Sequence, residues 1–302
     1  MTTLPGQRDV SMLDSATRGK KMQRIAVVTG ASRGAGKGIA IALGQAGMTV
    51  YVTGRTLADT CSPNGGTVTE TAELVTKAGG RGVAVPVDHA DDDAVAALFD
   101  RIRRDYGKVD VLVNNAASLI ATTQAGGFWE KPLEAVDLIS VGLRSHYVAS
   151  YHAAPLLIAG GHGLIVNTGH YGAVCYYQGP VYGAQKAGAD KMAADMAKEL
   201  RQHNVAAVSI WMGGLDTERA RTYLASLPPD ARPTAKRESP QFTGRVIAAL
   251  YGSDKRMKLS GRALIGAELG ADLGVTEIDG SHPLSHRSTM GGPPELHPSL
   301  TT

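Results

Sequence analysis

The sequence predicts an α/β fold: a single domain with a doubly wound parallel sheet of about seven strands flanked by helices. Short β-branched runs alternate with longer segments of helical spacing, which is the pattern of consecutive βαβ units. Several of the short runs are apolar almost throughout, as strands covered on both faces are. The 302 residues show no internal repeat and no linker, so one domain accounts for the pattern.

Each strand is expected where apolar and β-branched residues gather between turn residues. In chain order, the strand candidates are Ile25–Thr29, Thr49–Thr53, Gly82–Val87, Val109–Val113, Leu164–Asn167, Val205–Trp211 and Ala263–Ile265. Each helix is expected where apolar residues recur at helical spacing between two of these strands. The helix candidates are Gly36–Ala46, Thr67–Ala78, Asp91–Tyr106, Pro132–Ile158, Val181–His203 and Ser239–Tyr251.

Three stretches fall outside this alternation. Residues 218–238 contain three prolines, so we expect a lid or substrate loop there rather than a core element. Residues 1–23 lack the apolar stretch of a secretory signal and are expected to form a flexible tail. Residues 276–302 mix Gly, Pro, Ser and His without periodicity, which predicts a polar tail that orders only against a partner subunit. The domain is therefore expected to span residues 24–275.

The composition argues against several classes of protein. With 31 Lys and Arg against 28 Asp and Glu, the chain lacks the charge surplus typical of nucleic-acid binders. No apolar run approaches the ~18 residues of a membrane span, so we expect no membrane partner. Cys61 and Cys175 cannot form a disulfide framework, and no CxxC is present for zinc. We therefore expect a cytoplasmic protein without a metal site.

A glycine-rich sequence, TGASRGAGKG at residues 29–38, joins the first predicted strand to the first predicted helix. Glycines let a backbone turn sharply and approach a pyrophosphate, and a helix N-terminus offers unpaired N–H groups to it. The alternative is a glycine-rich turn without a ligand, but the strand–turn–helix context favours a Rossmann-type dinucleotide site. Its expected contacts are Gly30, Ser32, Arg33, Gly34, Ala35 and Gly36.

Three further motifs follow in a fixed order along the chain. Asp88 comes after the third predicted strand, Asn115 and Ala116 come after the fourth, and Tyr182-Gly-Ala-Gln-Lys186 opens a helix. Taken singly, these are a helix cap, a turn signal and a solvated helix face. Together with the Gly-x3-Gly-x-Gly spacing, they make the chain resemble the short-chain dehydrogenase/reductase family from about Gln23 to at least Gly266.

The resemblance implies roles for these residues. Asp88, Asn115 and Ala116 are then expected to contact the cofactor, and Tyr182 to give a proton to a substrate carbonyl. Lys186, one helical turn from Tyr182, is expected to hold the nicotinamide ribose and to lower the pKa of the phenol. The family's Pro-Gly pair reads Met212-Gly213 in this chain, so Gly213 and Thr217 are also expected at the cofactor.

The end of the second predicted strand indicates which cofactor is preferred. NAD-type sites place an acid there for the ribose 2′-hydroxyl, whereas a 2′-phosphate needs cations. The sequence has Arg55 and no acid at this position, and Arg33 in the glycine loop is a second cation. We therefore expect NADP(H) to be preferred over NAD(H); the alternative is that Arg55 is only a surface residue.

The chain departs from the family at two catalytic positions. The family's serine, 12 or 13 residues before the tyrosine, falls on His170 or Gly169. The imidazole of His170 is a candidate donor to the substrate oxygen. In the alternative, the ring only occupies space, and a hydroxyl of Tyr171, Tyr176 or Tyr177 makes the bond, or none does. The family's helix asparagine is replaced by Gly142.

These features predict an oxidoreductase that uses NADP(H) to interconvert a carbonyl and an alcohol on a small, apolar substrate. The alternative is a catalytically degenerate NADP(H)-binding protein that acts as a redox sensor or assembly partner. The walls of the substrate pocket are expected to include Ile120, Phe128, Trp129, Tyr177, Trp211 and Leu215, although several of these could be core.

The resemblance also implies a homodimer or homotetramer with two-fold symmetry. The predicted helices Pro132–Ile158 and Val181–His203 are those that form a four-helix interface in the family. They carry more small and apolar residues than one sheet face needs, namely Ala153, Ala154, Ala187, Ala189, Met192, Ala193 and Met196.

Overall fold

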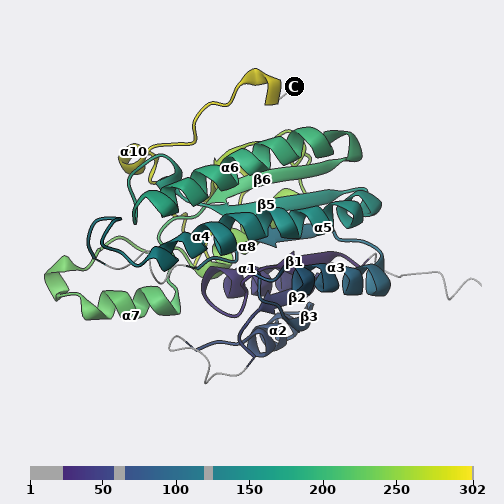
Figure 1. Cartoon of the computed structure of the whole chain (residues 1–302), viewed down its shortest axis with the longest axis horizontal. Helices are drawn as coiled ribbons and strands as arrows, with labels where there is room; N and C mark the ends of the chain where they lie inside the picture. Colours follow the sequence, from purple (N-terminus) through teal and green to yellow (C-terminus); the bar gives the residue numbers. More distant parts are fainter. Residues whose placement is uncertain (1–22, 58–64, 119–124, 301–302) are drawn as a thin grey trace, which may run out of the picture.

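A seven-stranded parallel sheet in the order β3-β2-β1-β4-β5-β6-β7 runs through the molecule (Figure 1). The computed structural model describes residues 23–57, 65–118 and 125–300. The strands are β1 (Ile25–Val28), β2 (Thr49–Gly54), β3 (Arg81–Pro86), β4 (Val111–Asn114), β5 (Gly163–Gly169), β6 (Val205–Trp211) and β7 (Ala263–Ile265). The predicted fold class is confirmed, and each predicted strand is present within two residues of its expected bounds.

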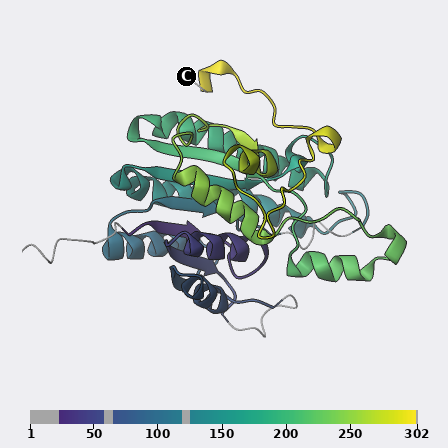
Figure 2. The same ribbon diagram turned by 180° about the vertical axis from the view of Figure 1, so that it is seen from behind.

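Helices cover both faces of the sheet (Figures 1 and 2). One face packs against α1 (Gly34–Gln45), α2 (Val68–Lys77) and α8 (Pro240–Tyr251), and its core includes the buried Ile39, Val50 and Phe242. The other face packs against three longer helices, with a second core around Phe99, Leu112 and Leu157. These helices are α3 (Asp92–Tyr106), α5 (Ser145–Gly160) and α6 (Pro180–Leu200).

The strand order reverses between β1 and β4: from β1 the sheet grows outward through β2 and β3, and from β4 it grows the other way through β5, β6 and β7. Because all strands are parallel, their carboxyl ends lie on one edge. Ligands of doubly wound sheets bind outside this edge, at the point where the order reverses. The glycine loop, Asn115 and His170 all follow carboxyl ends of strands in this part of the sheet.

The prediction of one uninterrupted helix over Pro132–Ile158 is wrong. The segment forms the 3₁₀ turn η4 (Leu133–Val136), the short α4 (Asp137–Ile139), the π-helical turn η5 (Ser140–Arg144) and then α5. The interruption is held by a side chain from α6, because Gln185 Nε2 donates a 2.6 Å hydrogen bond to Gly142 O. The last turn of the predicted Val181–His203 helix is likewise 3₁₀, as η7 (Arg201–His203).

The proline-containing stretch 218–238 holds a helix that the sequence did not predict. Thr217 caps α7 (Glu218–Ser226) by accepting a 3.2 Å bond from Ala220 N, and Pro228 ends the helical stretch. No residue of α7 is buried, and the helix projects beside the carboxyl edge of the sheet (Figure 1). The short η8 (Pro229–Ala231) follows it. A role as a lid remains a prediction.

The predicted C-terminal tail contacts the domain. Glu277 is buried and accepts bonds of 2.7 and 2.6 Å from the amide and hydroxyl of Ser239. Farther on, His286 N donates a 3.0 Å bond to the hydroxyl of Tyr171, ahead of α10 (Arg287–Met290). The chain also forms α9 (Gly266–Asp272) before this segment and η9 (Pro298–Leu300) at its end. Residues 1–22 of the predicted N-terminal tail lie outside the described residues.

Candidate active site

The glycine loop between β1 and α1 has the backbone form that close approach to a ligand requires. Gly30 and Gly34 have φ values of +63° and +56°, which favour glycine. A Cβ on Gly36 would lie 2.4 Å from Gly30 O, so a side chain there would force the loop apart. Gly34 is the first residue of α1, and Ala35 is half-buried in the same first turn. The amides of the loop therefore sit at the positive end of a helix.

Asn115 and Ala116 support this loop. Asn115 Nδ2 donates to Thr29 O at 2.8 Å and to Gly30 O at 3.1 Å, and both Asn115 N and Ala116 N donate to Thr29 Oγ1. A Cβ on Gly30 would meet Ala116 Cα at 2.7 Å. These bonds from Asn115 and Ala116 therefore fix the conformation of the glycine loop. The structure brings these sequence-predicted residues together at the end of β1 and β4.

Two arginines flank the end of β2. Arg33 Nη2 donates to Thr56 Oγ1 at 2.9 Å and to Gly66 O at 3.2 Å, so its side chain reaches across the glycine loop to the turn after β2. Arg55 is exposed in that turn. Ser32, between loop and turn, is nearly buried. Arg33 therefore lies in the loop after β1, and Arg55 lies in the turn after β2.

Asp88 lies at the end of β3, where its Oδ1 accepts a 3.0 Å bond from Ala90 N. Beside it is a residue that the sequence analysis missed. His89 is buried, and its Nε2 is 2.8 Å from Thr53 Oγ1 on β2. Burial lowers the pKa of His89 to about 4, so the imidazole is neutral at physiological pH. His89 therefore joins the ends of β2 and β3 at this edge; its position directly after a strand was the available signal.

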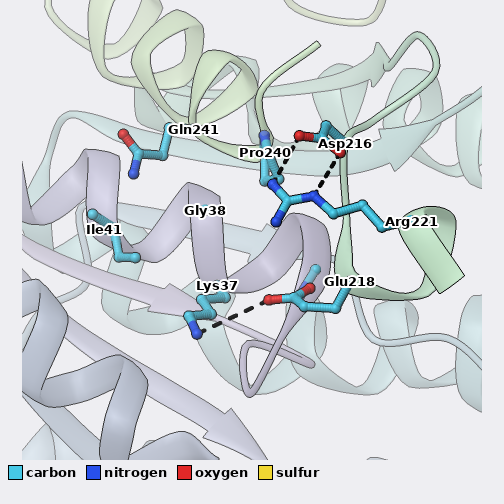
Figure 3. Close-up of a pocket in the computed structure, with 9 residues that line it drawn as sticks. Lys37, Gly38, Ile41, Asp216, Glu218, Arg221, Pro240 and Gln241 are labelled. Atoms are coloured by element: carbon cyan, nitrogen blue, oxygen red, sulfur yellow. Dashed lines mark hydrogen bonds and ion pairs between the residues drawn. The ribbon is translucent and has the colours of Figure 1, made fainter. Parts of the chain in front are cut away.

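Glu218, the first residue of α7, bonds directly to the glycine loop. Its Oε2 accepts a 3.1 Å hydrogen bond from Gly34 N, and its Oε1 is 4.0 Å from Lys37 Nζ (Figure 3). A pocket of about 140 Å³ lies on this side of α1, lined by Gly34, Lys37, Gly38, Ile41, Asp216, Glu218, Arg221, Pro240 and Gln241. It meets the glycine loop only at Gly34 and contains none of the predicted catalytic side chains.

Tyr182 and Lys186 lie together in the first turns of α6, and both are 6% exposed. Lys186 Nζ is 5.5 Å from the centroid of the Tyr182 ring and donates a 2.9 Å bond to Thr168 O on β5. Burial lowers the pKa of Lys186 to about 8, against the opposing effect of Asp190 one turn farther along α6. The ammonium is still mostly charged at neutral pH.

The pKa of Tyr182 differs from the expectation. Burial raises it above its ordinary value, and the cation that acts in the opposite direction is Arg219 rather than Lys186. The Lys186 ammonium lies over the face of the ring and donates to Thr168 O. A phenol with a raised pKa keeps its proton at neutral pH, which is the state a proton donor needs.

His170 lies at the end of β5, against two tyrosines. Its ring centroid is 4.5 Å from that of Tyr177 and 5.6 Å from that of Tyr182. Burial lowers the pKa of His170 to about 3, so the ring is neutral. Its Nδ1 accepts a 2.9 Å bond from Gly172 N, which places the ring proton on Nε2. The structure therefore leaves one N–H donor on a neutral imidazole beside Tyr182.

The loop after β6 is held by the buried carboxyl of Glu238, which no sequence motif pointed to. Glu238 Oε1 accepts a 3.1 Å bond from Gly213 N, and a Cβ on Gly213 would lie 2.3 Å from this oxygen. Within the described part of the chain, Glu238 Oε2 has no hydrogen-bond partner. Burial raises the pKa of Glu238 to about 7. Gly213 thus sits on a buried acid, four residues before Thr217.

Arg219 is a third residue that the sequence did not predict, after His89 and Glu238. It follows Thr217 by two residues in the first turn of α7, and its charge acts on the phenols of Tyr182 and Tyr177. Its position two residues after Thr217 was the available signal in the sequence. Its relation to Tyr182, at the N-terminal end of α6, depends on the fold.

The predicted pocket walls divide into three groups. Phe128 and Trp129 are 65% and 76% exposed, and Tyr177 is 39% exposed beside His170. Trp211 is wrong as a wall: it is fully buried, packs against Tyr171, and donates to Asp190. Leu215 pairs with Glu238 in an isolated bridge, and Ile120 lies outside the described residues.

The described residues lack a cluster of metal ligands and a membrane-spanning helix. No group of three or more His, Cys, Asp or Glu side chains among residues 23–57, 65–118 and 125–300 could hold a metal ion. In the same ranges, no helix combines the length and the apolar character that crossing a membrane requires.

Comparisons with known proteins give a consistent result. A family model described as short chain dehydrogenase matches residues 24–227. The protein named Dehydrogenase/reductase SDR family member 1 of Mus musculus is 38% identical over 270 residues, covering 85% of this chain and 84% of its own. The 2-dehydro-3-deoxy-D-gluconate 5-dehydrogenase of Escherichia coli strain K12 is 34% identical over 234 residues, covering 76% and 83%. The crystal structure of a candidate dehydrogenase from Xanthomonas campestris shares the fold, with a TM-score of 0.73 at 24% identity, covering 86% and 93%.

Proposed function

This chain belongs to the short-chain dehydrogenase/reductase family of NAD(P)-binding oxidoreductases, and from that premise we propose that it interconverts a carbonyl and an alcohol with NADP(H). The observation that carries the proposal is the arrangement at the end of β5: a protonated Tyr182, a charged Lys186 and a neutral His170 lie against one another. Each offers a hydrogen-bond donor to the same region. Such a group stabilises an oxygen that gains negative charge.

The glycine loop fits a dinucleotide. The positive φ values of Gly30 and Gly34 let the backbone turn sharply into α1, and the helix end behind the loop favours an anion. Gly30 and Ala35 would hold the pyrophosphate together with Gly34, whose amide would exchange Glu218 Oε2 for a phosphate oxygen, and Asn115 supports the loop. Arg55 and Arg33 support a preference for NADP(H), because a 2′-phosphate pairs with cations. No acid stands at the end of β2 to accept a hydrogen bond from a ribose 2′-hydroxyl.

When bound, the nicotinamide would supply a hydride. The side chains of the protein bind and orient the reactants and supply the proton. We expect Lys186 to hold the ribose hydroxyls, because its ammonium is fixed on Thr168 O and has two further donors. Tyr182 gives its proton to the substrate oxygen as the carbonyl is reduced. His170 Nε2–H donates to that oxygen and orients it, in the place of the family's serine.

The position of the family's asparagine has no side chain in this enzyme. A Cβ on Gly142 would lie 3.0 Å from Leu138 Cδ1 and 3.2 Å from Gln185 Cγ, so a larger residue would require these side chains to shift. The carbonyl of Gly142 is also taken, by Gln185 Nε2. The proposed reaction therefore rests on Tyr182, Lys186 and His170.

The experiment is an assay of the purified protein with NADPH and a panel of ketones, aldehydes, quinones and oxo acids, followed by the loss of NADPH absorbance. Oxo acids belong in the panel because one relative is named for a gluconate. The proposal expects turnover of at least one carbonyl compound with NADPH. Tight NADPH binding without turnover of any compound would instead favour the catalytically degenerate alternative, a sensor or assembly partner.

We also propose that the enzyme forms a two-fold symmetric dimer or tetramer through α5 and α6. Of the apolar residues predicted for this interface, Ala153, Ala189 and Ala193 are fully buried within the chain itself. Tyr147 and Tyr151 on α5 are instead 55% and 65% exposed, and such an aromatic surface suits a partner. Light scattering at micromolar concentration should give at least twice the 31.5 kDa chain mass; a monomer would contradict this assignment.

A further inference from the structure

The first turn of α7 lies against the glycine loop of the cofactor site. Thr217 caps this helix, and its Cγ2 is 3.7 Å from the position that a Cβ on Gly34 would take. The next residue, Glu218, directs its carboxylate toward the start of α1, where Oε2 accepts a 3.1 Å hydrogen bond from Gly34 N. This contact joins the beginnings of two helices that are far apart in the sequence.

The bond occupies an amide that the cofactor site needs. Gly34 is the first residue of α1, so its N–H has no acceptor within the helix. α1 carries no acid in its own first turn, and the negative charge at this helix end comes from α7 instead. An amide at the positive end of a helix binds a phosphate oxygen for the same reason that it binds a carboxylate. The two anions therefore compete for one donor.

Glu218 can leave this amide at low cost. Its side chain is 42% exposed, and α7 has no buried residue that a shift of its first turn would unpack. The other carboxylate oxygen, Oε1, already lies 4.0 Å from Lys37 Nζ, and both residues line the pocket of about 140 Å³ beside α1 (Figure 3). A carboxylate displaced from Gly34 N therefore keeps a cation beside it and requires no rearrangement of the core.

We propose that Glu218 is an intramolecular competitor of the cofactor's pyrophosphate: its carboxylate holds the Gly34 amide in the free protein and leaves it when the dinucleotide binds. This inference rests on the proposed dinucleotide site and adds to it a control of cofactor affinity. Binding must break a charge-assisted hydrogen bond, and the carboxylate and the phosphates repel each other during the exchange. When the cofactor leaves, the carboxylate takes the amide back. Glu218 therefore weakens cofactor binding and speeds cofactor release.

The test is the affinity of the purified protein for NADPH, measured by nucleotide fluorescence, in the parent and in Glu218→Gln. Glutamine keeps the size of the side chain and removes its charge, so the dissociation constant should fall roughly 3- to 10-fold. The release of bound NADPH, followed by stopped-flow displacement with excess NADP⁺, should slow by a similar factor. Neither readout depends on a carbonyl substrate.

Glu70→Gln is the matched control. Glu70 Oε1 is 2.7 Å from Lys37 Nζ, so both variants remove a carboxylate from the surroundings of the same ammonium. Glu70 accepts its bond from Lys37, however, and not from an amide of the glycine loop. Neither side chain is buried, so both variants should fold like the parent. The difference between the variants measures the contact with Gly34 N, and Glu218→Gln should tighten NADPH binding at least about three-fold more than Glu70→Gln does.

The outcomes separate this inference from the proposed reaction. Equal affinities in the two variants, or no gain of Glu218→Gln over the parent, would overturn the inference and leave the reaction intact. Tighter binding in Glu218→Gln alone, without reduction of any carbonyl compound, would support the inference while the proposed reaction fails. If neither the parent nor Glu218→Gln binds NADPH or NADH, both are overturned.

Discussion

The two ends of the candidate active site differ in how their geometry is held. In the cofactor half, at the ends of β1, β2 and β4, the shape comes mainly from backbone: glycines with positive φ form the loop, and the side-chain amide of Asn115 donates to its carbonyls. In the substrate half, at the ends of β5 and β6, it comes from side chains, through the rings of His170 and Tyr182. Backbone geometry tolerates few sequences and so leaves a motif. Side-chain geometry can be rebuilt with other residues.

This difference explains why the chain matches its family in one half and departs from it in the other. Any residue but glycine at position 36 would collide with Gly30 O at 2.4 Å. A hydrogen-bond donor beside Tyr182, by contrast, can be a hydroxyl or an imidazole. A substitution confined to one half should therefore leave the function of the other half unchanged.

The largest effect is expected from Tyr182→Phe, which removes the proton donor and leaves the cofactor half unchanged. Turnover should fall about 10³-fold, because Tyr182 is the assigned proton donor to the substrate oxygen. The dissociation constant for NADPH, measured by the fluorescence of the bound nucleotide, should stay within about two-fold of the parent value. A comparable loss of NADPH affinity would mean that the two halves are not separable.

The cofactor half is changed alone by Arg55→Asp. The parent should bind NADPH at least ~10-fold more tightly than NADH, because the exposed guanidinium pairs with a 2′-phosphate. The variant offers a carboxylate to the 2′-hydroxyl and should reverse the order. Fluorescence titrations with both nucleotides measure this. Equal dissociation constants for the two nucleotides in the parent would contradict the assignment of NADP(H).

A different effect, on stability rather than on turnover or cofactor preference, is expected after β6, where Glu238 Oε1 accepts a hydrogen bond from Gly213 N. The pKa of Glu238 is raised from 4.5 to about 7, so the folded state keeps the proton longer than the unfolded state does. Stability from this group is complete below pH 4.5 and is lost as the pH rises to about 7, by up to ~3 kcal/mol.

Glu238→Gln cannot ionise, so its stability relative to the parent should increase by a similar amount between pH 4.5 and 8. Chemical denaturation at several pH values measures the change, with the exposed Glu199→Gln as a control. If the parent and Glu238→Gln lose stability in parallel over this range, the carboxyl is not the group responsible.

The sequence predicted the sheet, its seven strands and the glycine loop between β1 and α1, because apolar runs and glycine spacing are local signals. It did not predict the break at Gly142, which depends on Gln185 from another helix, or the burial of Trp211 behind Tyr171. Arg219 and Glu238 were also missed, because their roles depend on which segments meet at the carboxyl edge. The signals of the substrate half are contacts between residues distant in sequence, and a single sequence does not show them.

His170 is where the account is tested most directly, because the proposed chemistry depends on its Nε2–H replacing the family's hydroxyl. The measurement is kcat for the best carbonyl substrate in the parent, His170→Ala and His170→Ser, together with NADPH affinity. Loss of an oxyanion donor predicts a ~10²-fold lower kcat in His170→Ala with unchanged NADPH affinity, and partial recovery in His170→Ser. If His170→Ala turns over as fast as the parent, the imidazole is only a wall of the pocket, and the account of the substrate half is contradicted.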